Sequence, residues 1–252
     1  MIKISGLSFE YIRGIKVLNG LNFDFEGGRF YALCGPNGCG KTTFLKIISG
    51  IYKNYLGSVR IRKDNSYAEL KLLNEVELSK LVSYVCGDTF FYFDFYVKDI
   101  LLMGRRRFHS FFSFYSDEDI DLIYDVARAM RIEHLFNRRI NELSNGERQM
   151  VLIAQAAVQK TSIILVDEPT SHLDIKHRIE ILSMLKEMVI NEKLTVIAVM
   201  HDLKAASYYF DQMLFMKNGS ICLNFSSNEF YANIDKISSV YEITSDVIKR
   251  FL

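Results

Sequence analysis

The sequence lacks a long apolar run, a large net charge and a cysteine framework, and each absence excludes a class of protein. Purely apolar runs such as residues 163–166 are far shorter than the roughly 20 residues that a membrane-spanning helix needs, so we expect no such helix. A net charge of +1 creates no overall field that would attract nucleic acid. The four cysteines form no C-x-x-C pair and have no histidines at zinc-finger spacing, which is typical of reduced thiols in a cytosolic protein.

Proline is also scarce, because Pro36 and Pro169 are the only two and both lie in motifs described below. The opening segment, MIKISGLSFEY, has no basic head followed by an apolar stretch, which predicts no signal peptide. The 252 residues, 49% of them hydrophobic, suffice for one large domain, and we expect a single domain over residues 1–252.

The hydrophobic pattern predicts an α/β protein. Residues 2–34 alternate between apolar and polar positions as strands do, and residues 57–73 do so again, which predicts a β-rich, antiparallel N-terminal layer. From about residue 97 the pattern becomes helical, and we place an inserted helical lobe at approximately 88–160 with Ser116 as a helix N-cap.

The second half of the chain has the rhythm of a buried parallel sheet. Two short, apolar, β-branched runs at 163–168 and 194–202 are separated by a helical segment at 174–193. A sheet with helices on both faces follows from this order. Residues from approximately 226 to 252 are predicted to form a small helical cap.

The strongest motif is GPNGCGKTT at residues 35–43, which matches the phosphate-loop pattern G-x-x-x-x-G-K-[ST] between a strand-like and a helical segment. Its glycines let backbone N–H groups point at phosphate oxygens, and the following helix adds its positive end. We expect Lys41 to bridge the β- and γ-phosphates of a nucleotide and Thr42 to bind Mg²⁺. The predicted nucleotide contacts in this loop are Gly35, Asn37, Gly38, Cys39, Gly40, Lys41, Thr42 and Thr43. A glycine-rich turn with an incidental lysine is the alternative.

Two carboxylates end the apolar run IILVDE. We expect Asp167 to bind Mg²⁺ together with Thr42, and Glu168, on another side of the strand end, to orient or deprotonate the water that attacks the γ-phosphate. His201 also follows a strand and is placed to hydrogen-bond the γ-phosphate. The alternative is that Glu168 only solvates the strand end and that His201 is structural.

Five motifs in register over nearly the whole chain resemble the ATP-binding cassette (ABC) family. They are Walker A at 35–43, a signature-like segment at 143–149, Walker B at 163–168, a D-loop-like SHLD at 171–174, and the switch residue His201. The resemblance implies a P-loop NTPase core that hydrolyses ATP with Mg²⁺. It also implies a head-to-tail homodimer, in which Ser144 and Gly146 of one copy donate to the γ-phosphate held by the other and Asp174 contributes from the D-loop.

Several positions depart from the family pattern or extend it. Asn145 replaces the usual signature glycine, which is tolerable because asparagine enters left-handed backbone conformations more readily than most residues. Tyr11, 24 residues before Gly35, stands where the family has an aromatic ring that stacks on adenine, with mere coverage of the β layer as the alternative. Gly87 replaces the glutamine that in the family contacts Mg²⁺ and approaches the attacking water. We expect Asp88 to substitute partly as a metal ligand, and hydrolysis to be slow or strongly dependent on partner binding.

The segments FDFYVKDILLMGRRRFH, SHLDIKHRIEIL and MHDLKAASYYFDQMLFMKNGSI resemble the cassettes of importers for iron–siderophore, haem and cobalamin complexes. This resemblance implies membrane-embedded permease subunits as partners, a substrate-binding protein as an indirect partner, no nucleic acid, and a peripheral location at the cytoplasmic face of the cell membrane. The aromatic stretches 90–96 and 108–115 are then expected to face the permease, with lobe core as the alternative for most of their rings.

Two other functions stay open. A non-hydrolysing or very slow ATP-dependent clamp would accord with Gly87, whereas the intact catalytic residues argue for hydrolysis. A soluble cassette ATPase acting on DNA or ribosomes would need a long coiled-coil insertion or a second cassette with a basic linker. About 109 positions separate Gly35 from Ser144, and no heptads occur among them.

Overall fold

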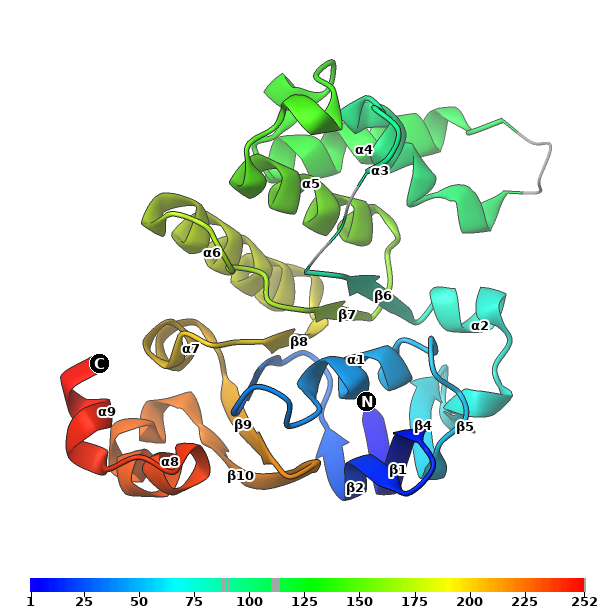
Figure 1. The fold of residues 1–252 in the computed structure, drawn as a ribbon. Coiled ribbons are helices and arrows are strands. Elements are labelled where there is room, and N and C mark those ends of the chain that lie inside the picture. The colour runs from blue at the N-terminus through cyan, green and yellow to red at the C-terminus, as the bar shows by residue number, and fades with distance from the viewer. Residues whose placement is uncertain (88, 90, 110–113, 252) are drawn as a thin grey trace.

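A computed structural model describes residues 1–87, 89, 91–109 and 114–251, and two sheets organise its strands (Figure 1). The first, which we call the N-terminal sheet, is antiparallel, with the strand order β2-β1-β4-β5. Its strands are β1 Ile2–Ile12, β2 Ile15–Phe25, β4 Leu56–Lys63 and β5 Ser66–Glu69. Residues 2–25 therefore form the predicted β-rich layer, and the second alternating stretch is two strands followed by a short 3₁₀ turn at Leu70–Leu72.

The second sheet, which we call the inner sheet, has the order β10-β9-β3-β8-β7-β6. Its neighbours run parallel except that β10 is antiparallel to β9. The strands are β3 Phe30–Cys34, β6 Val82–Val85, β7 Ile163–Val166, β8 Thr195–Val199, β9 Gln212–Lys217 and β10 Ser220–Ser226. The predicted α/β fold is confirmed. One assignment was wrong: β3 had been placed in the N-terminal layer, but it pairs with β8 and β9 because all five of its residues are buried between two layers.

Helices cover both faces of the inner sheet and extend beyond it. Helix α1 begins at Lys41, as the phosphate-loop motif predicted. In Figure 1, α3, α4 and α5 form a lobe above the sheet, and α8 and α9 lie beside β9 and β10 at the opposite end. The helices are α1 Lys41–Ile48, α2 Glu75–Ser79, α3 Val97–Met103, α4 Asp117–Ala129, α5 Asn145–Val158, α6 Ile175–Glu192, α7 Leu203–Tyr209, α8 Ile234–Tyr241 and α9 Ser245–Phe251.

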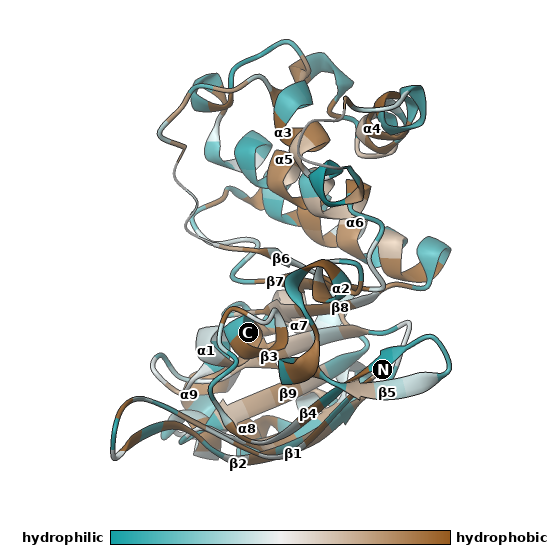
Figure 2. Ribbon diagram, turned by 90° about the vertical axis from the view of Figure 1, so that its right-hand side faces the viewer, coloured by the Kyte–Doolittle hydropathy of each residue, from teal (hydrophilic) through white to brown (hydrophobic). Residues whose placement is uncertain are grey.

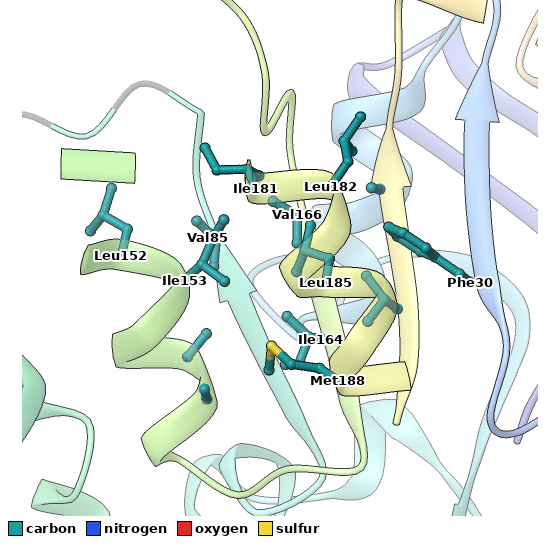
Figure 3. Close-up of a cluster of buried hydrophobic side chains, with 14 of the residues drawn as sticks. Phe30, Val85, Leu152, Ile153, Ile164, Val166, Ile181, Leu182, Leu185 and Met188 are labelled. Atoms are coloured by element: carbon teal, nitrogen blue, oxygen red, sulfur yellow. The ribbon is translucent and has the colours of Figure 1, made fainter. Parts of the chain in front are cut away.

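Alternation along the buried strands divides the core in two. In β3, Phe30 and Ala32 face one cluster while Tyr31 and Leu33 face the other. The first cluster lies under α5 and α6, whose apolar side chains meet those of β6 and β7 (Figure 3). The second cluster lies between the inner sheet, α1 and the N-terminal sheet. Because successive side chains of a strand point to opposite faces, one apolar strand serves both cores.

One helix of the lobe starts at a capping residue that the sequence predicted. Ser116 caps α4 through a capping box with Asp119, as predicted. Figure 2 shows hydrophobic residues along the inner strands and within α3 and α5. Among the described residues, no helix combines the length and the apolar character needed to cross a membrane.

The aromatic stretches divide between core and surface. Phe91 and Phe95 pack against the first core cluster, whereas Tyr92 is 95% exposed and Phe93 is 73% exposed. Phe114, in the second stretch, is 94% exposed. Phe90 and residues 110–113 lie outside the described part of the chain. Some of these rings therefore belong to the lobe core and others are exposed, and contact of the exposed rings with a permease stays a prediction.

Candidate functional site

The phosphate loop, residues 35–43, connects the carboxyl end of β3 to the start of α1. Gly40 precedes the helix with a φ of 104°, and no side chain caps the helix start. The N–H groups of the first turn therefore have no side-chain acceptor, which suits an anion. Asn37 and Gly38 are exposed, and Cys39 and Gly40 are buried. The loop follows a strand and precedes a helix, as the sequence predicted, and its role as an anion site stays a prediction.

Lys41 is buried and folds back on its own loop. Its Nζ donates to the carbonyl oxygens of Gly35 at 2.8 Å and Pro36 at 3.0 Å. The Sγ of Cys39 lies 4.0 Å from the same Nζ. An ammonium group at the centre of the loop is placed to bind phosphate oxygens. To do so, it has to give up its hydrogen bonds to the two carbonyl oxygens.

Asp167 follows β7 and has one carboxylate oxygen available for a cation. Its Oδ2 accepts a hydrogen bond from the Tyr84 hydroxyl at 3.3 Å, whereas its Oδ1 is buried and has no hydrogen-bond partner among the described residues. Burial raises the pKa of Asp167, the Thr42 hydroxyl lowers it, and the neighbouring charge of Glu168 raises it again, so the net pKa lies above its ordinary value. A buried, partnerless carboxylate oxygen beside a threonine hydroxyl fits Mg²⁺.

Glu168 is fixed by two side chains at the same edge of the inner sheet. Its Oε2 accepts a 2.6 Å hydrogen bond from the Ser171 hydroxyl, and its Oε1 lies 2.9 Å from the Nε2 of His201. Burial raises the pKa of Glu168, but the hydrogen bonds from Ser171 and His201 outweigh it, so the pKa is lower than usual. The backbone of Glu168 has a φ of 49°, a left-handed conformation that is common at functional sites. Glu168 is therefore ionised and oriented at neutral pH.

Gly87 packs directly on the chain that carries the two carboxylates. A Cβ at this position would lie 2.8 Å from the carbonyl oxygen of Asp167 and 3.6 Å from the Cβ of Glu168. This loop conformation has no room for a side chain, so glutamine is excluded sterically. Gly87 also lines a cavity of about 230 Å³ with Gln149, Glu168 and His172. Asp88, the predicted substitute ligand, lies outside the described residues.

The signature-like segment forms the start of α5. Ser144 is exposed and makes a capping box, in which its N–H and its hydroxyl both donate to the Oε2 of Glu147 at 2.8 Å. Asn145 is the first residue of the helix and does not have a positive φ, so the left-handed conformation invoked for it is not used. The reason is that residue N1 of a helix takes ordinary helical dihedral angles.

Gly146 is required by packing from another helix. A Cβ there would lie 2.5 Å from the ring of His177 on α6. The Nδ1 of His177 in turn lies 2.8 Å from the Oδ2 of Asp174, which caps α6. Among the described residues, Ser144 is thus hydrogen-bonded to Glu147 and Arg148 and Gly146 packs on His177, and neither is bonded to the phosphate loop.

Tyr11 lies near the end of β1, beside the phosphate loop. Its hydroxyl shares a 2.9 Å hydrogen bond with the Thr43 hydroxyl. The ring makes edge contacts with Phe9 and Tyr52, and the residue is 54% exposed. An exposed aromatic ring anchored to the loop suits a stacking role, and that role stays a prediction.

Three residues around the site were not predicted to act there. Tyr84 reaches Asp167 from the neighbouring strand β6, Ser171 reaches Glu168 from the following turn, and His177 packs under Gly146. Of these three contacts, only that of Ser171 could have been predicted from the sequence, because Ser171 follows Glu168 by three residues in one turn. The contacts of Tyr84 and His177 depend on strand pairing and helix packing.

Comparison with known proteins agrees with this geometry. The family model described as "ABC transporter" matches residues 18–171. An uncharacterized ABC transporter ATP-binding protein of Methanocaldococcus jannaschii is 34% identical, over 96% of this chain and 92% of that protein. The ferric enterobactin transport ATP-binding protein FepC of Escherichia coli is 30% identical, over 92% of this chain and 84% of that protein. A dimeric ATP-binding cassette in a post-hydrolysis state, bound to ADP and Pi, superposes with a TM-score of 0.76 at 26% identity, over 90% of this chain and 99% of that one.

Proposed function

This chain belongs to the ABC transporter family, and from that premise we propose that it is the ATP-hydrolysing subunit of an importer for an iron–siderophore, haem or cobalamin-type metal chelate. The observation that carries the proposal is the position of Glu168. Its ionised carboxylate is fixed by Ser171 and His201 beside Asp167, whose Oδ1 has no hydrogen-bond partner within the part of the chain that the structure describes. These groups lie at the edge of the inner sheet where the phosphate loop begins.

The phosphate chain of ATP is held by the loop in this proposal. Lys41 leaves the carbonyl oxygens of Gly35 and Pro36 and pairs with the β- and γ-phosphates, while the N–H groups of the first turn of α1 donate to phosphate oxygens. Thr42 and Asp167 would hold Mg²⁺, which when bound neutralises charge on the β- and γ-phosphate oxygens. Tyr11 stacks on the adenine ring.

Glu168 acts on the water that attacks the γ-phosphorus. Its carboxylate accepts a hydrogen bond from that water and orients it in line with the bond to the leaving ADP oxygen. When ATP is bound, the Nε2–H of His201, which contacts Glu168 in this structure, donates instead to a γ-phosphate oxygen. No covalent intermediate is needed, because positioning and charge complementarity supply most of the catalysis of phosphoryl transfer.

We further propose that two copies complete each site. Ser144 and Gly146 lie at the start of α5, which carries the positive end of a helix dipole. The Ser144 hydroxyl bonds Glu147 and Gly146 packs on His177, so within the described part of the chain neither contacts its own phosphate loop, which supports donation to the ATP of a partner copy. Asp174, on the D-loop, contacts His177, and His177 packs against Gly146. A dimeric cassette of similar fold supports the same arrangement.

The exposed rings support a membrane-embedded permease as the second partner. Tyr92, Phe93 and Phe114 lie in the helical lobe, and exposed aromatic side chains are typical of interfaces. The chain would then act at the cytoplasmic face of the cell membrane, with a substrate-binding protein as an indirect partner. The name of the ferric enterobactin relative supports a metal chelate as the transported class. Gly87 supports slow or partner-dependent hydrolysis, and Asp88 stays a proposed metal ligand.

The test replaces Glu168 with glutamine and measures phosphate release and ATP binding, both on the isolated chain and on the complex with its permease. We expect Glu168→Gln to lower the rate of hydrolysis about 10²-fold or more with ATP still bound, because the amide keeps the shape but loses the negative charge. The control is Glu187→Gln on the exposed side of α6, which should change neither quantity. Unchanged hydrolysis in Glu168→Gln would refute the assigned role.

A further inference from the structure

One side chain of the C-terminal cap is hydrogen-bonded to the phosphate loop. Tyr241 is the last residue of α8, and its hydroxyl accepts a 3.0 Å hydrogen bond from the N–H of Gly35, 206 positions away in the sequence. The cap lies beyond residues 18–171, the part matched by the family model. In Figure 1, α8 lies beside β9 and β10. In the inner sheet β9 is the neighbour of β3, the strand that leads into the loop.

The position of Tyr241 is fixed from two sides. Its ring meets that of Phe215 on β9 edge-to-face, with ring centroids 6.4 Å apart. Next to it, the Nζ of Lys217 donates to the carbonyl oxygen of Ser239 at 3.0 Å and pairs with the carboxylate of Glu242 at 3.0 Å. Burial raises the pKa of Tyr241, so its hydroxyl stays protonated at physiological pH. The hydroxyl is therefore a permanent, well-placed acceptor.

Gly35 needs this acceptor because its surroundings are closed. The residue is buried with a φ of 139°, and a Cβ there would lie 2.2 Å from the carbonyl oxygen of Met216. A backbone N–H that is buried in this way costs free energy when it has no partner. The hydrogen bond from Gly35 to Tyr241 consequently selects this conformation at the first residue of the loop.

The hydrogen bond between Gly35 and Tyr241 contributes most to the loop conformation when nucleotide binds, because Lys41 then gives up its own contacts with the loop. In this structure the Lys41 ammonium holds the carbonyl oxygens of Gly35 and Pro36. When Lys41 turns to phosphate, those two carbonyl groups lose it, and the Tyr241 hydroxyl still holds Gly35 from the opposite side. We propose that Tyr241 is a positioning residue for the phosphate loop, through which the C-terminal cap sets the affinity for ATP. The inference rests on the proposed role of the loop and of Lys41.

The experiment compares Tyr241→Phe with Tyr231→Phe in the full-length chain. The first variant removes only the hydroxyl that Gly35 uses, and the second removes a hydroxyl from an exposed ring of the same cap. Titration calorimetry gives the Kd for Mg-ATP, phosphate release gives KM and kcat, and hydrogen exchange reports the Gly35 amide. Lys41→Ala serves as a separate arm, because ATP binding that survives it would refute the proposed loop chemistry whatever Tyr241 does.

For Tyr241→Phe we expect the Kd and KM for ATP to rise about three- to tenfold, the range of a single net hydrogen bond, because a smaller fraction of the free protein holds the competent loop. We expect kcat at saturating ATP to stay within about twofold, exchange at Gly35 to accelerate, and Tyr231→Phe to match the wild type. Unchanged affinity, or a loss confined to kcat, would overturn the proposal. If Tyr241→Phe does not fold, hydrogen exchange of the wild type still tests the proposal. A wild-type Gly35 amide that exchanges as fast as an exposed amide would overturn the proposal.

Discussion

At the scale of single residues, Gly87 determines which side chains fit beside Asp167 and Glu168. The family pattern has glutamine here, yet the backbone of this loop lies so close to Asp167 that a Cβ would be 2.8 Å from its carbonyl oxygen. The two carboxylates are held instead by Tyr84, Ser171 and His201. Gly87 therefore lets two backbone segments lie in direct contact.

We predict that Gly87→Ala slows ATP hydrolysis about tenfold or more, because the clash displaces Asp167 and Glu168 and small misplacements of catalytic groups are costly. The same overpacking should lower the free energy of unfolding by about 1–3 kcal/mol. Phosphate release and urea denaturation measure the two effects. Gly27→Ala is the matched control, because a Cβ at Gly27 meets its nearest atom at 3.9 Å. Equal behaviour of the two variants would contradict the steric account of Gly87.

At the scale of elements, Asp119 joins the helices of the lobe. Its carboxylate lies on α4, accepts a 2.7 Å bond from Arg105 and lies 2.5 Å from the Nε2 of His109. Arg105 also donates to the carbonyl oxygen of Val158 at the end of α5. One buried carboxylate thus connects the segment after α3 with α4 and, through Arg105, with α5.

Asp119 should make the stability of the protein depend on pH. Burial raises the pKa of Asp119, but hydrogen bonds from Arg105, Ser116 and His109 lower it by a larger amount. The net pKa therefore falls from 3.8 to about 2. A carboxylate whose pKa is lowered on folding stabilises the fold above its unfolded pKa and loses that contribution as pH falls through its folded pKa. The contribution is therefore complete above about pH 4, is lost between about pH 4 and pH 2, and amounts to about 2 kcal/mol.

We predict that Asp119→Asn lowers the free energy of unfolding by at least about 2 kcal/mol at pH 7, because it also takes from the half-buried Arg105 its ion-pair partner Asp119. The difference from the wild type should shrink as the pH falls below 4. Urea denaturation at a series of pH values measures it. Asp117→Asn, two residues earlier on the exposed side of α4, is the control and should change stability by less than about 1 kcal/mol. A pH-independent difference would contradict the ion-pair explanation.

At the scale of the whole molecule, the proposed ATP site draws on two parts of the fold. The phosphate loop, Asp167, Glu168 and His201 lie at the edge of the inner sheet, while Ser144 and Gly146 begin α5 in the lobe. In the proposed dimer, a second copy turned head to tail would bring its Ser144 and Gly146 to the phosphate loop of the first copy. ATP, with its negative γ-phosphate between two positive helix ends, would then connect the two copies.

We predict that Glu168→Gln with Mg-ATP is a dimer and that the same protein with ADP is a monomer, because only ATP has the γ-phosphate that both copies bind. Analytical ultracentrifugation measures the two masses. Adding Ser144→Arg should prevent the dimer without weakening ATP binding to the isolated chain, since Ser144 contacts its own Glu147 and not its own phosphate loop. Full-speed hydrolysis by a monomer at all protein concentrations would contradict the shared site.

The sequence by itself determined the features that depend on neighbours along the chain. The glycine spacing of residues 35–43, the Ser116 cap and the acidic end of β7 each follow from a few adjacent residues, whose backbone conformations and burial are local properties. Tertiary structure decided the rest. It moved β3 into the inner sheet, closed Gly87 against Asp167, placed His177 under Gly146 and joined Tyr241 to Gly35. Contacts between residues so far apart in the chain leave no periodic pattern, because they are set by how the layers pack and not by any one segment.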